Sequence, residues 1–303
     1  MLFIMIACRF FSRVLQLNGP GMEWPLFDQD SGLYIGTSSW SEKSWQGVFY
    51  PEGLAPREFI RHYSTVYDSV EIDATFYAIP TRKTVEGWRE RTPAGFQFAA
   101  KVPRVITHDK ILVDAQEDME LFVETMQWLG DRLGPLLLQF PYFNRKVFSS
   151  PEPFFDRLDQ FLTRIPVGPR YVVEVRNRHW VGRRLEQLLR RHGVSLAWVD
   201  QAWMPEPEDW PRLLDGPGAG PGYFRFLGDH KQMDQLTEKW DRQVVDRRDR
   251  LARWVPLMRT FREAGVDVFG FFNNHYAGHA PATVEDFRSL WGAGADHSSS
   301  SSN

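Results

Sequence analysis

The chain has 303 residues, of which 43% are hydrophobic and 15% aromatic, and its formal net charge is −3. This charge excludes a global positive field that would attract nucleic acid or an anionic membrane, although a local basic site is compatible with it. The only cysteine is Cys8, which excludes a disulfide framework, a thiolate metal site and a cysteine nucleophile from the body of the chain. We therefore expect a protein of the cytoplasm with no part in a membrane.

Residues 1–28 are predicted to lie outside the folded domain. They open with seven apolar residues followed by Arg9 and Arg13. The apolar run is too short to span a bilayer, and the charge is on the wrong side for an ordinary secretory signal. A start of translation at Met22 rather than Met1 and a short amphipathic targeting segment both stay open. Residues 292–303 are mostly Gly, Ala and Ser and are predicted to be disordered, which leaves residues 29–291 as a single domain.

Eight short apolar runs recur within this domain, and their starts lie 25 to 45 residues apart. This spacing is expected when each strand is followed by a returning helix and all strands are parallel. The predicted strands are Leu33–Thr37, Val70–Ala74, Phe96–Lys101, Leu136–Phe140, Tyr171–Val175, Leu196–Asp200, Tyr223–Leu227 and Val268–Phe272. Eight such units predict a (β/α)8 barrel of the TIM type, in which function resides at the carboxyl ends of the strands.

The connections between the predicted strands are uneven. Helical periodicity is clearest in Pro56–Tyr67, Glu117–Leu129 and Asp241–Ala264. The sixth connection, Gln201–Gly222, instead carries five prolines and four glycines. It is predicted to be an irregular surface loop with at most one short turn, around Asp209–Leu214.

Charged residues alternate with apolar residues inside several predicted strands. In the run from Val70 to Asp73 the two carboxylates share one face, because successive strand side chains point to opposite sides. The apolar face of a barrel strand meets the helices, so the charged face is predicted to point toward the barrel axis. The same pattern in other strands predicts an inward cluster of Glu71, Asp73, Lys101, Glu174, Arg176, Asp200 and Arg225. The cluster is either an ion-pair network that keeps the strands in register or a functional site, and its members at strand ends favour a site.

Seven motifs occur in order along the predicted barrel, from about residue 33 to residue 291. They are Gly36-Thr37-Ser38-Ser39-Trp40, Val70-Glu71-Ile72-Asp73-Ala74-Thr75-Phe76-Tyr77, Lys101-Val102-Pro103-Arg104-Val105-Ile106-Thr107-His108, Gln139-Phe140-Pro141, Glu174-Val175-Arg176, Tyr223-Phe224-Arg225-Phe226-Leu227-Gly228 and Phe272-Asn273-Asn274-His275. Together they resemble the DUF72 (YecE-like) family. The resemblance implies a TIM-barrel fold and no agreed biochemical activity.

One hypothesis is a metal-dependent phosphoesterase or endonuclease-like enzyme. Nitrogen and oxygen ligands for Zn²⁺ or Mn²⁺ are available at or shortly after strand ends, in Glu174, Asp200, His108, His179, His230 and His275. No HxH or HExxH spacing appears, and a trinuclear zinc barrel needs more imidazoles and carboxylates and fewer inward cations. We therefore predict no cofactor and no resident metal, and keep a divalent metal as the alternative.

The preferred hypothesis is a hydrolase or lyase that acts on a small anionic or polyhydroxylated ligand at the rim. Arginine grips phosphate or carboxylate with two parallel hydrogen bonds, and carboxylates in a desolvated site can transfer protons. The candidate catalytic residues are Glu174, Asp200 and Lys101. The candidate substrate-binding residues are Arg176, Arg225, Asn273, Asn274, Gln139, Trp40, Tyr77 and His108, with the aromatic rings either stacking on the ligand or capping the barrel.

A third possibility is a non-catalytic barrel that binds nucleic acid. Aromatic residues next to arginine suit a single strand, whereas the negative net charge and the lack of a long basic stripe weigh against tight duplex binding. The sequence contains no Walker loop, no dinucleotide GxGxxG after a strand and no Ser-His-Asp constellation. It does not predict the oligomeric state.

Overall fold

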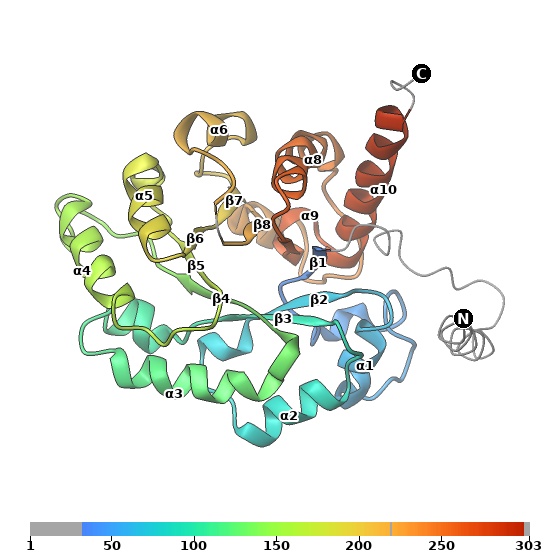
Figure 1. Cartoon of the computed structure of the whole chain (residues 1–303). Helices are drawn as coiled ribbons and strands as arrows, with labels where there is room; N and C mark the ends of the chain where they lie inside the picture. The colour runs from blue at the N-terminus through green and yellow to red at the C-terminus, as the bar shows by residue number, and fades with distance from the viewer. Residues whose placement is uncertain (1–31, 219, 300–303) are drawn as a thin grey trace, which may run out of the picture.

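The computed structural model describes residues 32–218 and 220–299, and residues 1–31, the predicted N-terminal extension included, lie outside the described residues. Its strands are all parallel and lie at the centre, with helices outside them (Figure 1). They are β1 Leu33–Thr37, β2 Ser69–Ile72, β3 Gln97–Lys101, β4 Leu133–Gln139, β5 Tyr171–Glu174, β6 Ser195–Leu196, β7 Trp198–Gln201, β8 Gly222–Gly228 and β9 Val268–Phe272. The fold is a TIM-type α/β barrel, as the spacing of the apolar runs predicts.

The sixth predicted strand is divided into β6 and β7 at Ala197. The first part pairs with β5 and the second with β8, so this strand joins the ladder β2-β3-β4-β5-β6 to the ladder β1-β9-β8-β7. A register shift follows in β7 between Asp200 and Gln201. Across this shift the partner residue moves from Phe226 to Gly228, so the extra residue, Leu227, belongs to β8, and the alternation of side chains along β7 continues to Gln201.

Side chains bridge β1 and β2, the other junction between the two ladders. The Thr37 amide donates to the Tyr63 hydroxyl at 2.8 Å, and that hydroxyl donates to the Ser69 carbonyl at 3.1 Å. The Ile35 amide donates to Asp68 Oδ1 at 3.0 Å. A Cβ atom at Gly36 would stand 1.9 Å from the Ser69 carbonyl oxygen, so only glycine allows this close approach of the two strands.

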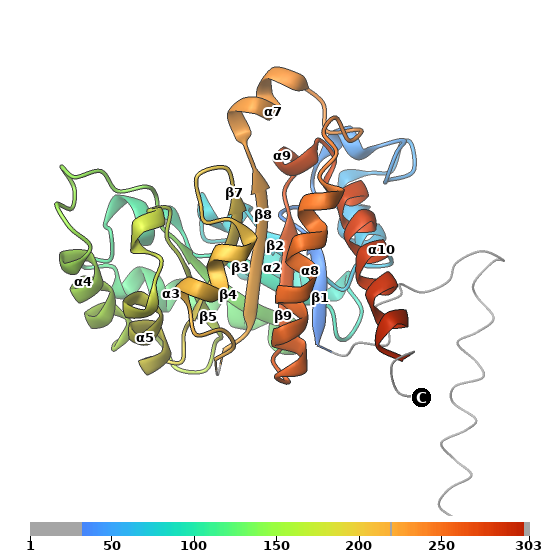
Figure 2. The same cartoon turned by 90° about the horizontal axis from the view of Figure 1, so that it is seen from above.

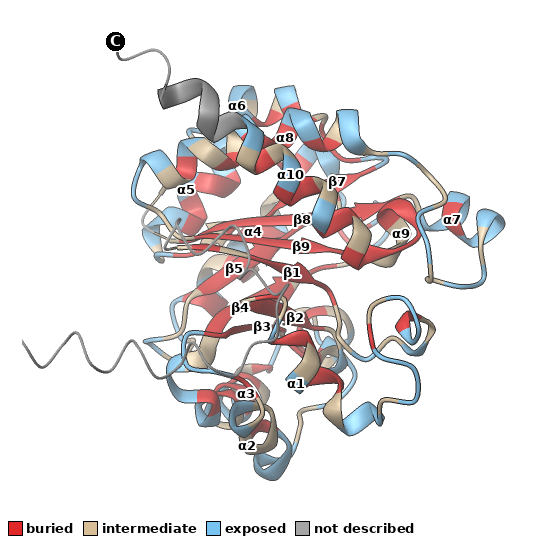
Figure 3. Cartoon of the chain, turned by 90° about the vertical axis from the view of Figure 1, so that its right-hand side faces the viewer, coloured by how far each residue is buried: buried red, intermediate tan, exposed pale blue. Residues whose placement is uncertain are grey.

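The α-helices form the outer layer. They are α1 Phe59–Tyr63, α2 Arg82–Glu90, α3 Gln116–Met126, α4 Glu152–Leu162, α5 Arg183–Arg191, α6 Trp210–Leu213, α7 His230–Leu236, α8 Arg248–Glu263, α9 Asn274–Ala277 and α10 Ala280–Ser299. Figure 2 shows α7 standing out beyond the end of β8, at the carboxyl end of the barrel. The strands inside this layer are buried along nearly their whole length (Figure 3).

Two helix boundaries differ from the sequence prediction. The helix predicted over Asp241–Ala264 begins only at Arg248, because the Val244 and Val245 amides both donate to the Ala277 carbonyl and hold that segment out of helical form. Helix α10 continues to Ser299 and so includes residues 292–299, most of the tail predicted to be disordered. Ala and Ser tolerate a helix once packed residues upstream have formed its first turns.

The sixth connection contains the short turn predicted near Asp209–Leu214, as α6. It is nevertheless more than a surface loop. Trp210 is fully buried and stacks on Trp198 of β7 with ring centroids 5.3 Å apart. No helix within residues 32–218 and 220–299 combines the length and apolarity that crossing a membrane requires.

Candidate functional site

Arg225 of β8 lies at the centre of a buried polar network inside the barrel. Its Nε and Nη2 donate to the two oxygens of Glu71 at 2.9 and 2.7 Å, and its Nη1 donates to Glu174 Oε2 at 2.6 Å. The Tyr223 hydroxyl adds a bond to Glu71 at 2.7 Å. Burial disfavours the charge of Arg225, but Glu174 and Glu71 hold its pKa well above the ordinary value. Arg225 is 1% exposed, so it supports the site from below and cannot reach a ligand directly, contrary to its sequence assignment as a substrate-binding residue.

Glu174, at the end of β5, connects this buried pair to the rim. Its second oxygen forms an ion pair with Arg176 Nε, and Arg176 also donates to Gln201 Oε1 of β7. Burial alone would raise the pKa of Glu174, but Arg176, Arg225 and Lys101 together hold it below its ordinary value. Glu174 is therefore an ionised carboxylate that positions two arginines.

Lys101, at the end of β3, pairs with Asp73 after β2, with Nζ 2.6 Å from Oδ1. Burial raises the pKa of Asp73, assisted by Glu71 and opposed by Lys101. With this pair, Glu71, Asp73 and Glu174 stand opposite Lys101, Arg176 and Arg225, and the charges of the network balance. The acids, rather than a bound anion, thus neutralise the three cations.

Asp200 does not belong to the network, and the prediction that it points toward the barrel axis is wrong. Its Oδ1 accepts from Arg250 Nε at 2.7 Å, and its Oδ2 accepts from Trp254 Nε1 at 2.7 Å and from the Tyr276 hydroxyl at 2.8 Å. Trp198, two residues earlier, packs against Trp210 in the outer layer, so the alternation along β7 places Asp200 on the outer face as well. The next residue, Gln201, takes the inward position.

Among the remaining predicted site residues, Asn273 and Asn274 line a cleft at the rim, whereas Trp40 packs against the core. Asn273 Oδ1 accepts from the His275 amide at 2.9 Å and lies 2.8 Å from the ring Nδ1. Asn274 Oδ1 accepts from Trp45 Nε1 at 3.3 Å. Both asparagines are thus partly engaged within the protein. Trp40 packs edge-on against Phe98 of β3, which is the capping role.

Three further predicted residues lie on loops or ends of strands. Gln139 Nε2 donates to the neighbouring Phe140 carbonyl at 2.7 Å. Tyr77 is 74% exposed on the loop after β2. His108 lies in a π-helical turn after β3, a rare conformation that is frequent at functional sites, and its ring packs on Phe76. Burial and Arg104 lower the pKa of His108, and Arg176 and Lys101 act in the same direction.

A groove of about 920 Å³ opens at the rim over Arg176. Its lining comes from the loops after β4, β5 and β7 and from α7: Tyr142, Phe143, Arg145, Phe148, Ser149, Ser150, Pro151, Arg176, Asn177, Arg178, His179, Trp180, Trp203 and Lys231. This lining contains four Lys or Arg residues and no acid. Arg178 lies 3.3 Å from Asp209, whereas Arg145 and Lys231 form no ion pair with the described residues. Tyr142 and Trp203 are 66% and 47% exposed beside these charges.

A smaller cleft of about 170 Å³ lies on the other side of the network, over the ends of β1 and β9. It is lined by Thr37, Ser38, Ser39, Glu42, Trp45, Asp73, Trp240, Phe272, Asn273, Asn274, His275 and Ala280. Asp73, the partner of Lys101, belongs to this wall. The groove is cationic and aromatic, whereas the cleft presents hydroxyls, amides and carboxylates.

Helix α7 links the two hollows. His230, its first residue, stacks on His275 of the cleft with ring centroids 4.0 Å apart, and Lys231 beside it lines the groove. Burial, His275 and Arg176 lower the pKa of His230 to about 4. His230 is therefore a neutral imidazole at neutral pH, between two hollows that open on the same network.

The histidines and carboxylates proposed as metal ligands are not gathered into a metal site. Among the residues that the structure describes, no three His, Cys, Asp or Glu side chains are grouped to hold a metal ion. Asp200 is bound by α8 and α9, Glu174 by two arginines, and His179 lines the groove. This donor set does not fit the metal-dependent alternative.

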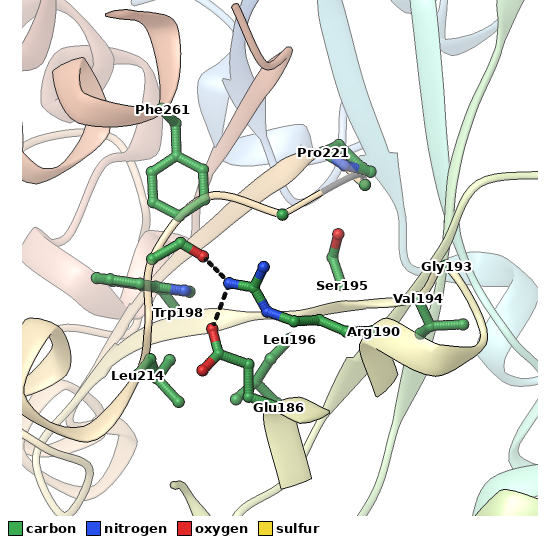
Figure 4. A pocket seen from close by; sticks show the side chains of 13 residues that line it. Glu186, Arg190, Gly193, Val194, Ser195, Leu196, Trp198, Leu214, Pro221 and Phe261 are labelled. Atoms are coloured by element: carbon green, nitrogen blue, oxygen red, sulfur yellow. Dashed lines mark hydrogen bonds and ion pairs between the residues drawn. The ribbon is translucent and has the colours of Figure 1, made fainter. Parts of the chain in front are cut away.

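A third hollow, of about 40 Å³, lies at the opposite end of the barrel, at the amino ends of β6 and β8 (Figure 4). Arg190 Nη2 donates there to Glu186 Oε1 at 2.9 Å and to the Gly216 carbonyl at 2.7 Å. Because these charged groups satisfy one another, the hollow offers little to a ligand.

Sequence reasoning missed several residues of the rim. Gln201 lies one residue after Asp200, so strand alternation with the outward Trp198 was the signal for it. Arg145 and Trp203 lie in loops and Lys231 lies in α7, all without a recognisable motif. The one available signal for these three was their position shortly after a strand, which is where barrels carry their sites.

Comparisons with known proteins give matches along most of the chain. The family model described as "Protein of unknown function DUF72" matches residues 34–302. UPF0759 protein YecE of Escherichia coli (strain K12) is 30% identical over 170 residues, which span 56% of this chain and only 57% of that protein. UPF0759 protein YunF of Bacillus subtilis (strain 168) is 27% identical over 265 residues, which span 82% of this chain and 90% of that protein. The crystal structure of a DUF72 family protein from Thermotoga maritima is similar with a TM-score of 0.67 and 27% identity, over 85% of this chain and 98% of that one.

Proposed function

We propose that the barrel rim of this protein binds a small anionic molecule and acts on it as a hydrolase or lyase. The chain belongs to the DUF72 family, whose function is unknown. The observation that supports this most directly is the groove over Arg176, whose lining has four cationic side chains and no carboxylate. The inner network is electrically balanced by itself. The excess positive charge therefore belongs to the groove wall, at Arg145 and Lys231.

Each part of the rim has a role in this proposal. Arg145 and Lys231 attract and hold the anion, and Arg176, kept in place by Glu174 and Gln201, forms the floor. Lys101 and Asp73 are the proton-transfer pair, because burial raises the pKa of Asp73 beside an ammonium group. Glu174 is a positioning residue that keeps Arg176 and Arg225 oriented.

Phosphate is the simplest probe of the anion site. Phosphate should raise the melting temperature in proportion to the logarithm of its concentration, beyond the effect of sodium chloride at equal ionic strength. The double variant Arg145→Gln, Lys231→Met should lose most of that increment and keep the phosphate-free melting temperature. Arg191→Gln removes an exposed arginine at the far end of α5 and serves as the matched control. Equal stabilisation of the double variant and the parent by phosphate would disprove the anion site.

Turnover of phosphate esters tests the chemistry separately from binding. Lys101→Met should abolish turnover while phosphate still stabilises the variant. EDTA should leave the rate unchanged, whereas a rate that requires added Mn²⁺ or Zn²⁺ would favour the metal-dependent alternative.

Single-stranded nucleic acid is the second candidate ligand, since Tyr142 and Trp203 are exposed beside Arg145. A short oligothymidylate should then bind with an affinity that falls steeply with salt concentration, and Trp203→Ala should weaken it. Oligothymidylate affinity no better than that of inorganic phosphate would exclude this candidate.

A further inference from the structure

Ser38, directly after β1, has a buried hydroxyl in the wall of the smaller cleft. The residue is 3% exposed, and its Oγ has no hydrogen-bond partner among the described residues. Its neighbours differ in this respect: Thr37 Oγ1 donates to the Ser39 carbonyl at 2.6 Å, and Ser39 Oγ lies 3.1 Å from Ser41 Oγ. A buried polar group without a partner is disfavoured, so a group that enters the cleft and bonds to Ser38 gains the full benefit of pairing it.

The chemistry of the cleft wall indicates what that group is. Ser38, Ser39, Asn273 and Asn274 offer hydroxyls and amides, which both donate and accept hydrogen bonds. The carboxylates of Glu42 and Asp73 accept them, and no lysine or arginine lines the cleft. Such a wall disfavours a second anion and suits a moiety with several hydroxyl groups.

An aromatic side chain closes one side of the cleft. Trp240 is half-buried, and its ring lies 4.6 Å from the ring of His275 between centroids. An indole that is apolar on its face and polar at its edge packs well against the C–H face of a sugar ring. Hydroxyl partners and an apolar face thus occur together in this one hollow.

The cleft and the groove open on the same network. Asp73 of the cleft pairs with Lys101, and Lys101 and Arg176 both lower the pKa of His230, whose ring stacks on His275 of the cleft. Lys231, next in the chain, lines the groove. The two hollows therefore flank one network, with the Lys101–Asp73 pair beside the cleft and Arg176 in the groove.

We propose that the cleft is a polyol subsite, so that the protein binds a phosphorylated sugar with its phosphate in the groove and its hydroxyl-bearing ring in the cleft. This inference rests on the proposed function for the anionic half of the ligand. It adds the class of the other half and identifies Ser38 as a residue that determines specificity.

Binding measurements with matched probes test the subsite. The probes are inorganic phosphate, D-ribose, D-glucose, ribose 5-phosphate and glucose 6-phosphate, measured by titration calorimetry on the full chain. At least one sugar phosphate should bind at least about tenfold more tightly than phosphate, because a second set of hydrogen bonds and ring contacts is added. Ser38→Ala should weaken that sugar phosphate about fivefold and leave phosphate unchanged, without lowering the melting temperature. Ser64→Ala, which removes the hydroxyl of another buried serine outside the cleft, should change neither affinity.

The outcomes separate the two proposals. Sugar phosphates that bind no better than phosphate, or a Ser38→Ala variant with unchanged affinity for them, would overturn the polyol subsite and leave the anion site standing. Arg145→Gln should weaken phosphate and the sugar phosphate by the same factor. If neither phosphate nor a sugar phosphate binds the parent, the proposed function fails, and the bipartite ligand with it.

Discussion

Individual side chains in the barrel divide into those that a ligand can reach and those that are committed to other protein groups. Arg225 uses three N–H groups on Glu71 and Glu174, and Asp200 accepts three hydrogen bonds from outer helices. Breaking a buried ion pair by removing one partner commonly costs about 3–5 kcal/mol, because the other charge stays buried without compensation. Residues committed in this way affect stability first and function only through it.

The Asp200→Asn variant distinguishes a structural role of Asp200 from a role in ligand binding. Asparagine has one acceptor oxygen where the carboxylate has two, so at least one of Trp254, Tyr276 and Arg250 loses its acceptor. We expect the free energy of unfolding to fall by about 3 kcal/mol in urea titrations, with phosphate affinity unchanged. The sequence assignment of Asp200 as a catalytic residue implies the opposite result, a variant that folds normally and has lost ligand binding or activity. A stable variant that has lost phosphate binding would restore Asp200 to the site.

Asp68 provides a pH-dependent contribution at the β1–β2 junction. Burial raises the pKa of Asp68 to about 6 from 3.8, against the Ile35 amide and Arg288, which lower it. The folded state then binds a proton more tightly than the unfolded state, so this group lowers stability as pH rises from about 4 to about 6. Asp68→Asn keeps an acceptor for the Ile35 amide but does not titrate. We therefore expect the free energy of unfolding to fall by about 2 kcal/mol less between pH 4 and pH 6 in the variant than in the parent. Urea titrations of parent and variant at pH 4, 5, 6 and 7 would show this, and parallel curves would contradict it.

At the scale of elements, the barrel is closed by two junctions of different kinds. One is the divided strand β6–β7, which pairs with β5 through its first part and with β8 through its second. At the other, Tyr63 and Asp68 side chains connect β1 and β2, and Gly36 permits the contact. Strand alternation after the outward Asp200 places the side-chain amide of Gln201 beside Arg176. The pairing of strands at the two junctions therefore fixes which polar groups meet at the rim.

Gly36→Ala tests the β1–β2 junction. The added Cβ would lie 1.9 Å from the Ser69 carbonyl oxygen. That oxygen belongs to the backbone of β2, which cannot shift without a large energetic cost. We expect a loss of about 3 kcal/mol or more in the free energy of unfolding, at the upper end of overpacking effects. Gly182→Ala is the control, since that glycine has an extended backbone with φ 170° and open space around it. Similar unfolding midpoints for the two variants would show that the junction is not tight.

At the scale of the whole molecule, the described chain is one barrel whose last helix packs back on its strands. Phe287 of α10 packs on Phe272 of β9, and the Trp291 carbonyl accepts from Arg259 of α8. The groove and the cleft lie at one end of this barrel, and the hollow of Figure 4 lies at the other. The groove and the cleft are thus both at the carboxyl ends of the strands, where barrels carry their sites, whereas a further hollow of about 470 Å³ lies between the start of α3 and α4.

A chain that ends at Trp291 should therefore retain the barrel. Removal of residues 292–303 leaves the contacts of Phe287 and Trp291 in place, so we expect the melting temperature to stay within about 3 °C of that of the full chain. Trp291→Ala in the full chain should lower it further, because a buried ring that stacks under Arg259 is lost. Loss of cooperative unfolding on truncation would show that the end of α10 is essential.

The sequence by itself determined the order and approximate bounds of the strands, except for the division of the sixth into β6 and β7, because apolar runs and their spacing are local properties of the chain. It also located Lys101, Glu174 and Arg176 at strand ends, since strand alternation is equally local. Only the tertiary structure showed which face of β7 points outward, through the stacking of Trp198 on Trp210, and strand alternation then places Asp200 outward and Gln201 inward. The tertiary structure alone showed that Arg145, Trp203 and Lys231 share one groove, since they come from two separate loops and from helix α7. Contacts between distant segments depend on how the barrel closes, and no local pattern in the chain records that.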